Sequence, residues 1–290
     1  MILNEIEILK YIASFRNDFL NVFFDIITML GEESIMIIFV MILYFAFDKK
    51  YAYKLFFICV MSLSINNILK NFVKLQRPFK NKEVTCLKEE TATGYSFPSG
   101  HTQTFATISS SLAIKYKKIW FSILTTLLII LVAFSRMYLG AHYLTDVIIG
   151  ALLGVIISVI GSKIYDKFDN KRKLYLILLL ILTPFTIFFL INKDPLYNDF
   201  FKVYGTIIGL FLAIPLEEKY GKIDYNVSGY KKAIRVIFGV ILAYIIKEAT
   251  KLIGVFESVE ISLLFSTIRY IIIIFIVLGI YPIVIKKLKL

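Results

Sequence analysis

Histidine is scarce in this 290-residue chain, and its two copies, His101 and His142, both stand beside residues that could assist them in catalysis. Asp146 follows His142 by four positions, so on a helix the two side chains would share one face. The carboxylate can then accept one imidazole N–H, which leaves the other ring nitrogen free to attack. A chance pair at a helix end is the alternative, but ionisable groups are costly in so apolar a sequence. The spacing therefore indicates a nucleophilic histidine oriented by an aspartate.

Three cations precede this pair at the end of an apolar run. Lys70, Lys74 and Arg77 are spaced i, i+4 and i+7, so a helix ended by Pro78 would present all three on one face. Arginine offers a planar fork to two phosphate oxygens, whereas lysine offers a point charge. Cations that only extend toward water from a helix end are the alternative interpretation. Together with Arg136, just before the His–Asp pair, the cluster indicates a phosphate site.

Another polar segment, formed by Ser99, Gly100 and His101, predicts a helix start that binds an anion. Ser99 is a favourable N-cap residue, and Gly100 lets the backbone approach a ligand closely. The free N–H groups and the dipole of a helix start attract phosphate. His101 would lie at the mouth of that site, where it is a candidate proton donor.

Together these segments form the pattern K-x6-R-P, P-S-G-H and S-R-x5-H-x3-D. With this pattern the chain resembles the type 2 phosphatidic acid phosphatase family, and the resemblance covers roughly residues 33–192. The matching residues are Lys70, Arg77, Pro78, Pro98, Ser99, Gly100, His101, Ser135, Arg136, His142 and Asp146. The resemblance implies a membrane lipid phosphatase without a metal or other cofactor. A two-metal site would need several converging carboxylates, and the signature offers only Asp146.

The resemblance also implies a role for each group, which the residue chemistry allows. His142 would attack phosphorus and form a phosphohistidine, with Asp146 orienting it. His101 would protonate the leaving oxygen and then activate water. Five groups would hold the phosphate oxygens and stabilise the charge of the transition state. They are Lys70, Arg77, Ser99, Gly100 and Arg136.

The expected substrate is a lipid phosphate or diphosphate of the undecaprenyl diphosphate, phosphatidylglycerophosphate or phosphatidic acid type. A lipid phosphotransferase using the same His–Asp chemistry is the first alternative. A lipid transporter on this scaffold is the second, although such a scaffold need not keep both histidines. The expected partners are therefore the substrate and membrane lipids, and the sequence leaves the oligomeric state open.

The elements that must position these residues are membrane helices. Hydrophobic residues make up 58% of the chain and charged residues 19%, and a soluble domain of this size cannot bury so much apolar surface. The net charge of +12 is explained by Lys and Arg in loops, and nucleic-acid binding is not expected because no basic stripe lies outside them. Cys59 and Cys86 are not expected to pair, since they lie in an apolar run and a distant polar loop.

We expect an all-α integral membrane protein in three parts. An N-terminal segment at 1–32 is amphipathic and interfacial, with a further span as the alternative. A six-helix transmembrane phosphatase core at 33–192 and about three additional C-terminal transmembrane helices at 193–290 complete the chain. The apolar runs lie near 33–47, 52–74, 100–115, 118–138, 142–163, 173–192, 199–216, 231–253 and 264–285.

Basic residues gather in alternate loops and in the C-terminal tail. The positive-inside rule predicts a multi-pass protein of the cell membrane with these loops and the C-terminus in the cytoplasm. The site and the N-terminus are then expected on the extracytoplasmic face. The loop at 75–99 is basic on the opposite side from the others, which favours a role in holding phosphate.

Overall fold

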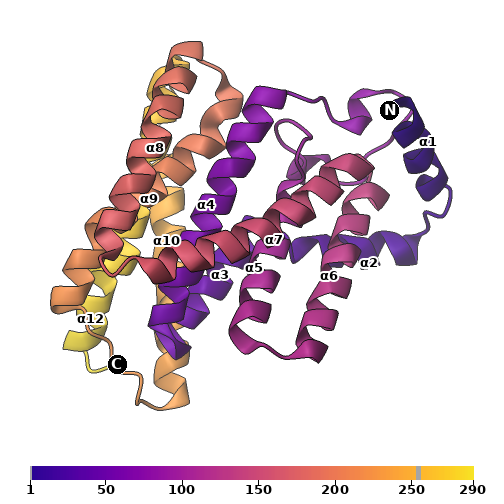
Figure 1. Ribbon diagram of the computed structural model, residues 1–290. Coiled ribbons are helices and arrows are strands. Elements are labelled where there is room, and N and C mark those ends of the chain that lie inside the picture. Colours follow the sequence, from indigo (N-terminus) through magenta and orange to yellow (C-terminus); the bar gives the residue numbers. More distant parts are fainter. Residues whose placement is uncertain (1, 253–255) are drawn as a thin grey trace. The chain divides into compact units, whose positions relative to one another are not determined.

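The computed structural model describes residues 2–252 and 256–290, and these form helices joined by turns and loops, with no β-strand among them (Figure 1). The all-α architecture is therefore confirmed. The chain forms two compact units, one made of Met1–Ile37 and Phe57–Lys163, the other of Ile38–Phe56 and Ile164–Leu290. All eight site residues expected from the sequence lie in the first unit.

The first unit contains the N-terminal helices and the helices that carry the sequence motifs. Its elements are α1 (Ile2–Ala13), α2 (Asp18–Met29), the start of α3 (Glu33–Ile42), most of α4 (Lys49–Val73), the 3-10 turns η2 (Pro78–Lys80) and η3 (Glu89–Thr91), α5 (Gly100–Tyr116), α6 (Ile119–Tyr138) and most of α7 (Leu144–Lys167).

Close approach of α5 and α7 depends on two glycines one helical turn apart. A Cβ at Gly150 would lie 2.7 Å from the Ser99 carbonyl oxygen, and one at Gly154 would lie 2.6 Å from the Ala106 Cβ. Small residues spaced by four positions let membrane helices pack backbone to backbone. This contact holds the start of α5 against α7.

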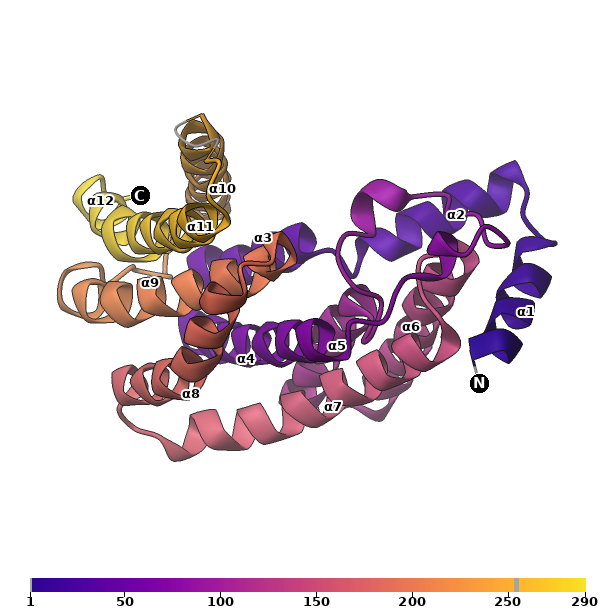
Figure 2. The same cartoon turned by 90° about the horizontal axis from the view of Figure 1, so that it is seen from above.

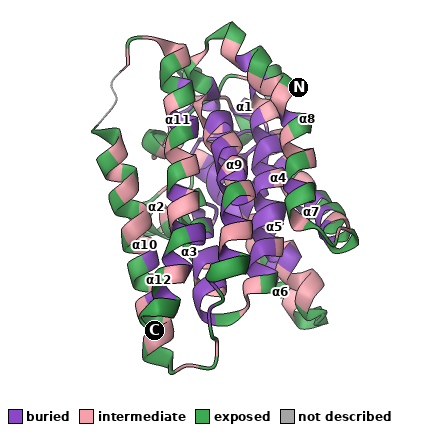
Figure 3. Cartoon of the chain, turned by 90° about the vertical axis from the view of Figure 1, so that its left-hand side faces the viewer, coloured by how far each residue is buried: buried purple, intermediate pink, exposed green. Residues whose placement is uncertain are grey.

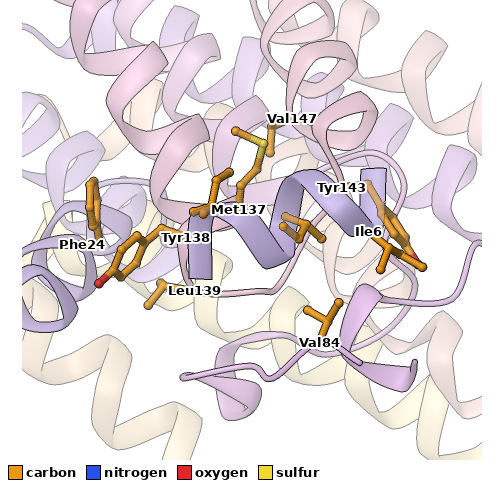
Figure 4. Close-up of a cluster of buried hydrophobic side chains, with 10 residues drawn as sticks. Ile6, Phe24, Val84, Met137, Tyr138, Leu139, Tyr143 and Val147 are labelled. Carbon is orange, nitrogen blue, oxygen red and sulfur yellow. The ribbon is translucent and has the colours of Figure 1, made fainter. Parts of the chain in front are cut away.

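The N-terminal helices α1 and α2 pack beside α6, as Figures 1 and 2 show from two directions. Their buried apolar side chains join those of the loop after α4 and of the α6–α7 junction in one cluster (Figure 4). Its members are Ile6, Leu9, Ile12, Phe24, Val84, Met137, Tyr138, Leu139, Tyr143 and Val147. The sequence indicated one N-terminal helical segment, whereas the structure has two helices joined by a short turn.

The second unit contains α8 (Lys171–Asn192), η4 (Pro195–Tyr197), α9 (Asn198–Tyr220), α10 (Gly229–Lys251), α11 (Val259–Ile274), the π-helical segments η1 (Leu43–Phe47) and η5 (Phe275–Ile280), and α12 (Tyr281–Lys287). Within it α9 packs against α8 and α11. Eleven of the 23 residues of α9 are buried, whereas α10 exposes residues along its whole length, as Figure 3 shows.

Six of the described helical stretches are long and apolar enough to cross a membrane, so the chain is a multi-pass membrane protein. They are Lys49–Lys80, Ile119–Tyr138, Leu144–Lys167, Lys171–Asn192, Pro195–Tyr220 and Val259–Lys287. Asp18–Met29 and Glu33–Phe47 would form a seventh, bent by 51°. The 17-residue α5 and the charged α10 are not among these stretches. The exact number of additional helices therefore remains a prediction.

Candidate active site

His142 lies in the turn between α6 and α7, and Asp146 lies in the first turn of α7. The Asp146 Oδ2 atom is 3.2 Å from the His142 Nδ1 atom and also accepts the Tyr143 backbone N–H at 2.9 Å. A carboxylate at the third helical position commonly caps the backbone N–H just before the helix in this way. The expected His–Asp contact is present, but the expectation that both residues lie on a helix was wrong, because α7 begins at Leu144.

This carboxylate determines which nitrogen of His142 is free. An ionised carboxylate only accepts hydrogen bonds, so the Nδ1 atom carries the proton and the Nε2 atom keeps its lone pair. The Arg77 Nη1 atom lies 3.1 Å from Nε2 and can donate to that lone pair. Both His142 and Asp146 are fully buried. The Nε2 atom of His142, which can attack, therefore faces the Arg77 guanidinium. The same guanidinium could bind the anion that is attacked.

Burial lowers the pKa of His142 well below the ordinary value, and the charges of Arg77, Arg136 and Lys70 lower it further. A positive charge on the ring is disfavoured both by loss of water and by nearby cations. The imidazole is therefore neutral at physiological pH. His101 is also among the nearby groups that lower the pKa of His142.

Arg77 reaches the site from an extended segment, and the expected continuous helix face was wrong. Helix α4 ends at Val73, and Lys74 adopts a left-handed conformation with φ of 52° and is exposed. The residue before a proline is driven toward extended backbone, as Arg77 is before Pro78. Its guanidinium donates to the carbonyl oxygens of Gly94 at 2.9 Å and of Ala141 at 3.1 Å. Arg77 therefore joins the loop before α5 to the turn that carries His142.

Helix α5 begins at Gly100 with Ser99 as its N-cap residue, as expected. The Ser99 side chain makes no capping bond and lies 3.0 Å from the Thr102 hydroxyl. Its backbone N–H donates to the Asp146 carbonyl oxygen at 3.0 Å, which joins this loop to α7. The Lys70 Nζ atom lies 3.7 Å from the position of a Cβ on Gly100. The start of α5 and a lysine ammonium thus meet beside the His–Asp pair.

Three site residues carry buried polar atoms that have no hydrogen-bond partner among the described residues, and one of these atoms is Asp146 Oδ1. Arg136 is fully buried, and its Nη1 atom donates to the Thr28 hydroxyl at 2.8 Å, whereas Nε and Nη2 remain unpaired. The Nε2 atom of His101 is likewise unpaired. Buried polar groups without partners are rare and call for an explanation, which a bound anion would supply for the unpaired guanidinium donors of Arg136. The structure therefore brings all eight expected site residues into one place.

Residues that the sequence analysis did not single out complete this arrangement. The Ser96 hydroxyl donates to Asp146 Oδ2 at 2.5 Å and lies 3.4 Å from His142 Nδ1. The Asn66 amide donates to the Gln103 side chain at 2.8 Å, which supports the loop before α5 from within the core. An asparagine inside an apolar run was a usable signal for Asn66. Ser96 carried no such signal, because it lies in a loop rich in polar residues.

One other sequence expectation, that the two cysteines do not pair, is confirmed. Cys59 and Cys86 are both free thiols. The loop carboxylates Glu89 and Glu90 are exposed. In the second unit, Lys251 pairs with Glu248 at 2.9 Å.

Comparison with known proteins identifies the family. A model described as the PAP2 superfamily matches residues 50–170, and one described as the PAP2 superfamily phosphatase transmembrane extension matches 201–290. An undecaprenyl-diphosphatase from Sulfolobus acidocaldarius is 31% identical over 168 residues, covering 58% of this chain and 81% of that protein. The chain belongs to the PAP2 superfamily.

Two further relatives illustrate the range of this similarity. A phosphatidylglycerophosphatase B from Bacillus subtilis is 29% identical over 119 residues, covering 38% of this chain and 55% of that protein. A dihydrosphingosine 1-phosphate phosphatase from Schizosaccharomyces pombe is 25% identical over 286 residues, covering 88% of this chain and 69% of that protein. The chain is accordingly a membrane lipid phosphatase of the PAP2 type, a phosphoric ester hydrolase.

Proposed function

We propose that this protein hydrolyses a lipid phosphate or diphosphate through a phosphohistidine on His142. The observation that carries the proposal is the buried chain of contacts from Asp146 Oδ2 through the His142 ring to Arg77 Nη1. It pairs a neutral imidazole, oriented by a carboxylate, with a cation placed at the attacking nitrogen. A phosphate bound by Arg77 would lie against that nitrogen in position for attack.

In the first step the His142 Nε2 lone pair forms a bond to phosphorus, and the bond from phosphorus to the lipid oxygen breaks. The departing oxygen takes a proton from His101, which enters this step as an imidazolium and becomes neutral, and leaves as the lipid alcohol, or as the lipid monophosphate from a diphosphate. Asp146 stabilises the positive charge that develops on the His142 ring. In the second step His101 accepts a proton from water, whose oxygen bonds to phosphorus as the bond to nitrogen breaks.

Negative charge on the phosphoryl oxygens must be stabilised in both steps. Lys70, Arg77 and Arg136 supply cations, and Ser99 and Gly100 contribute the start of α5. The unpaired Nε and Nη2 atoms of buried Arg136 support this assignment, because they are donors already held in place. Donors fixed before the reaction need no reorganisation when charge develops.

The relatives' names suggest which lipids to test. They act, by name, on undecaprenyl diphosphate, phosphatidylglycerophosphate and dihydrosphingosine 1-phosphate, which share a phosphate or diphosphate on an apolar tail. We include phosphatidic acid because the sequence motifs resemble its phosphatases. We also propose a site on the extracytoplasmic face of the cell membrane, a cytoplasmic C-terminus, a core at 33–192 and an extension at 193–290.

Phosphate release and thin-layer analysis of the purified protein with these four lipids would test the proposal. We expect release from at least one lipid, loss of release in His142→Ala, and retained release in the exposed-loop control Glu90→Gln. A lipid labelled with ³²P on the terminal phosphate should give an acid-labile labelled protein in wild type and none in His142→Ala. Hydrolysis of none of the four, or undiminished hydrolysis by His142→Ala, would refute it.

The fate of the label separates hydrolysis from transfer. Label in free phosphate identifies a hydrolase, whereas label in a second lipid identifies a phosphotransferase. Vanadate should inhibit the protein and EDTA should not, since the proposed chemistry uses no metal.

A further inference from the structure

The N-terminal helices α1 and α2 lie outside the segments matched by the family models, the first of which begins at residue 50. Each nevertheless places a polar side chain against a site residue or the residue next to one. The contacts are made by Thr28 at the end of α2 and by Glu5 in the first turn of α1.

Thr28 holds the buried arginine. Helix α2 buries Phe24 and Thr28, one helical turn apart, while Phe19 and Ile26 are 76% and 60% exposed. The Thr28 hydroxyl, itself fully buried, accepts from Arg136 Nη1 at 2.8 Å. This is the one hydrogen bond that the structure gives to the Arg136 guanidinium within the described residues, and it leaves Nε and Nη2 available for phosphate.

Glu5 holds the start of the helix that carries Asp146. Its Oε1 atom accepts the Thr145 backbone N–H at 3.0 Å, and its Oε2 atom accepts from the Thr145 hydroxyl at 3.2 Å. Thr145 is the second residue of α7, so Glu5 supplies a negative acceptor where a helix start requires one. Asp146 is the next residue, so the contact with Glu5 also fixes the position from which Asp146 contacts His142.

We propose that Glu5 and Thr28 are positioning residues for phosphoryl transfer, acting through α7 and Arg136 respectively. This inference rests on the proposed function of the site. The N-terminal helices are already attached by the apolar cluster of Figure 4 and by Arg16, which donates to the Tyr138 carbonyl oxygen at 2.6 Å. Removing one polar contact should therefore leave the helices docked and disturb only the group that the contact orients.

Thr28→Val keeps the side-chain shape and removes the acceptor, and Thr28→Ser restores the hydroxyl. We expect Thr28→Val to weaken binding of orthovanadate and to lower kcat/KM, each by about tenfold, the usual effect of losing a hydrogen bond to a charged group. Thr28→Ser should stay within about threefold of wild type. The matched control is Thr125→Val, because the buried Thr125 hydroxyl bonds only the Ser122 carbonyl of its own helix in the described structure.

Glu5→Ala should lower kcat by about tenfold with little change in KM, because Thr145 orients Asp146 and does not touch phosphate. Glu5→Gln keeps an acceptor oxygen and should recover most of kcat. The matched control is Glu7→Ala, whose carboxylate is exposed and pairs with Lys10 on the same helix. The melting temperature in detergent should be similar for all variants.

The two readouts separate this inference from the proposed function. Vanadate binding depends on Arg136 whichever lipid is the substrate, so a tenfold weaker affinity in Thr28→Val would support the positioning role even if no tested lipid were hydrolysed. Vanadate affinity and kinetics equal to wild type in Thr28→Val and Glu5→Ala would overturn it. Equal losses in the serine and glutamine variants, or in the two controls, would also overturn it.

Discussion

Ser96 provides the sharpest test of how the His–Asp pair is held. Its fully buried hydroxyl donates to the same Asp146 oxygen that contacts His142, so Ser96→Ala removes one of three donors from that atom. A hydrogen bond to an ionised group contributes about 1.5–3 kcal/mol. Since about 1.4 kcal/mol corresponds to a tenfold change in rate, loss of this bond should lower kcat/KM by about 10- to 100-fold.

The assay is phosphate release under kcat/KM conditions, with melting temperature in detergent as the measure of folding. Ser158→Ala is the matched control, because Ser158 is equally buried but bonds the Thr107 and Gly154 backbone carbonyls between α5 and α7. A double-mutant cycle adds the decisive comparison. If Ser96 acts through the carboxylate, Ser96→Ala should cost little once Asp146 is alanine. Equal losses in the two backgrounds, or a loss below twofold in the single variant, would refute this reasoning.

Three further outcomes are expected. Arg77→Lys should lower kcat/KM by at least about tenfold although the charge is retained. The reason is that one ammonium cannot replace a guanidinium that donates to several acceptors at once. Unchanged kinetics would contradict this. Burial and nearby cations lower the pKa of His142. The acidic limb of the pH profile of kcat/KM should therefore lie below about pH 6.5, the ordinary imidazole value. An acidic limb above that pH would show that the His142 ring is not held neutral. Gly31→Ala should lower the free energy of unfolding by about 1–3 kcal/mol, measured by denaturation in detergent. The added Cβ would lie 2.6 Å from the His101 carbonyl oxygen, so the backbone must shift. An unchanged free energy of unfolding would contradict this.

The sequence predicted most of what is local in this molecule. Apolar length located the helices, and Ser99 correctly marked the start of α5, although its side chain makes no capping bond there. The eight site residues could be named because each stands in a short motif. Their assembly in one place agrees with that prediction, while their chemical roles remain proposals.

What the sequence could not predict depends on backbone geometry and on distant partners. A uniform helical spacing placed Arg77 and His142 on helices, whereas a left-handed turn and a capped helix start place both in connecting segments. Thr28 and Glu5 meet partners more than a hundred residues away, and no periodicity encodes such a contact. Only the packing of α1 and α2 on the α6–α7 junction reveals them.

The contacts of Glu5 and Thr28 also bear on the order in which the protein matures. Synthesis proceeds from the N-terminus, so both residues leave the ribosome before the helices that carry Thr145 and Arg136 exist. The contacts of α1 and α2 with Thr145 and Arg136 can form only after the α6–α7 junction has been synthesised. The two contacts therefore form only once residues 136 and 145 exist, about half-way along the 290-residue chain, so the N-terminal helices remain without these polar partners during the first half of synthesis.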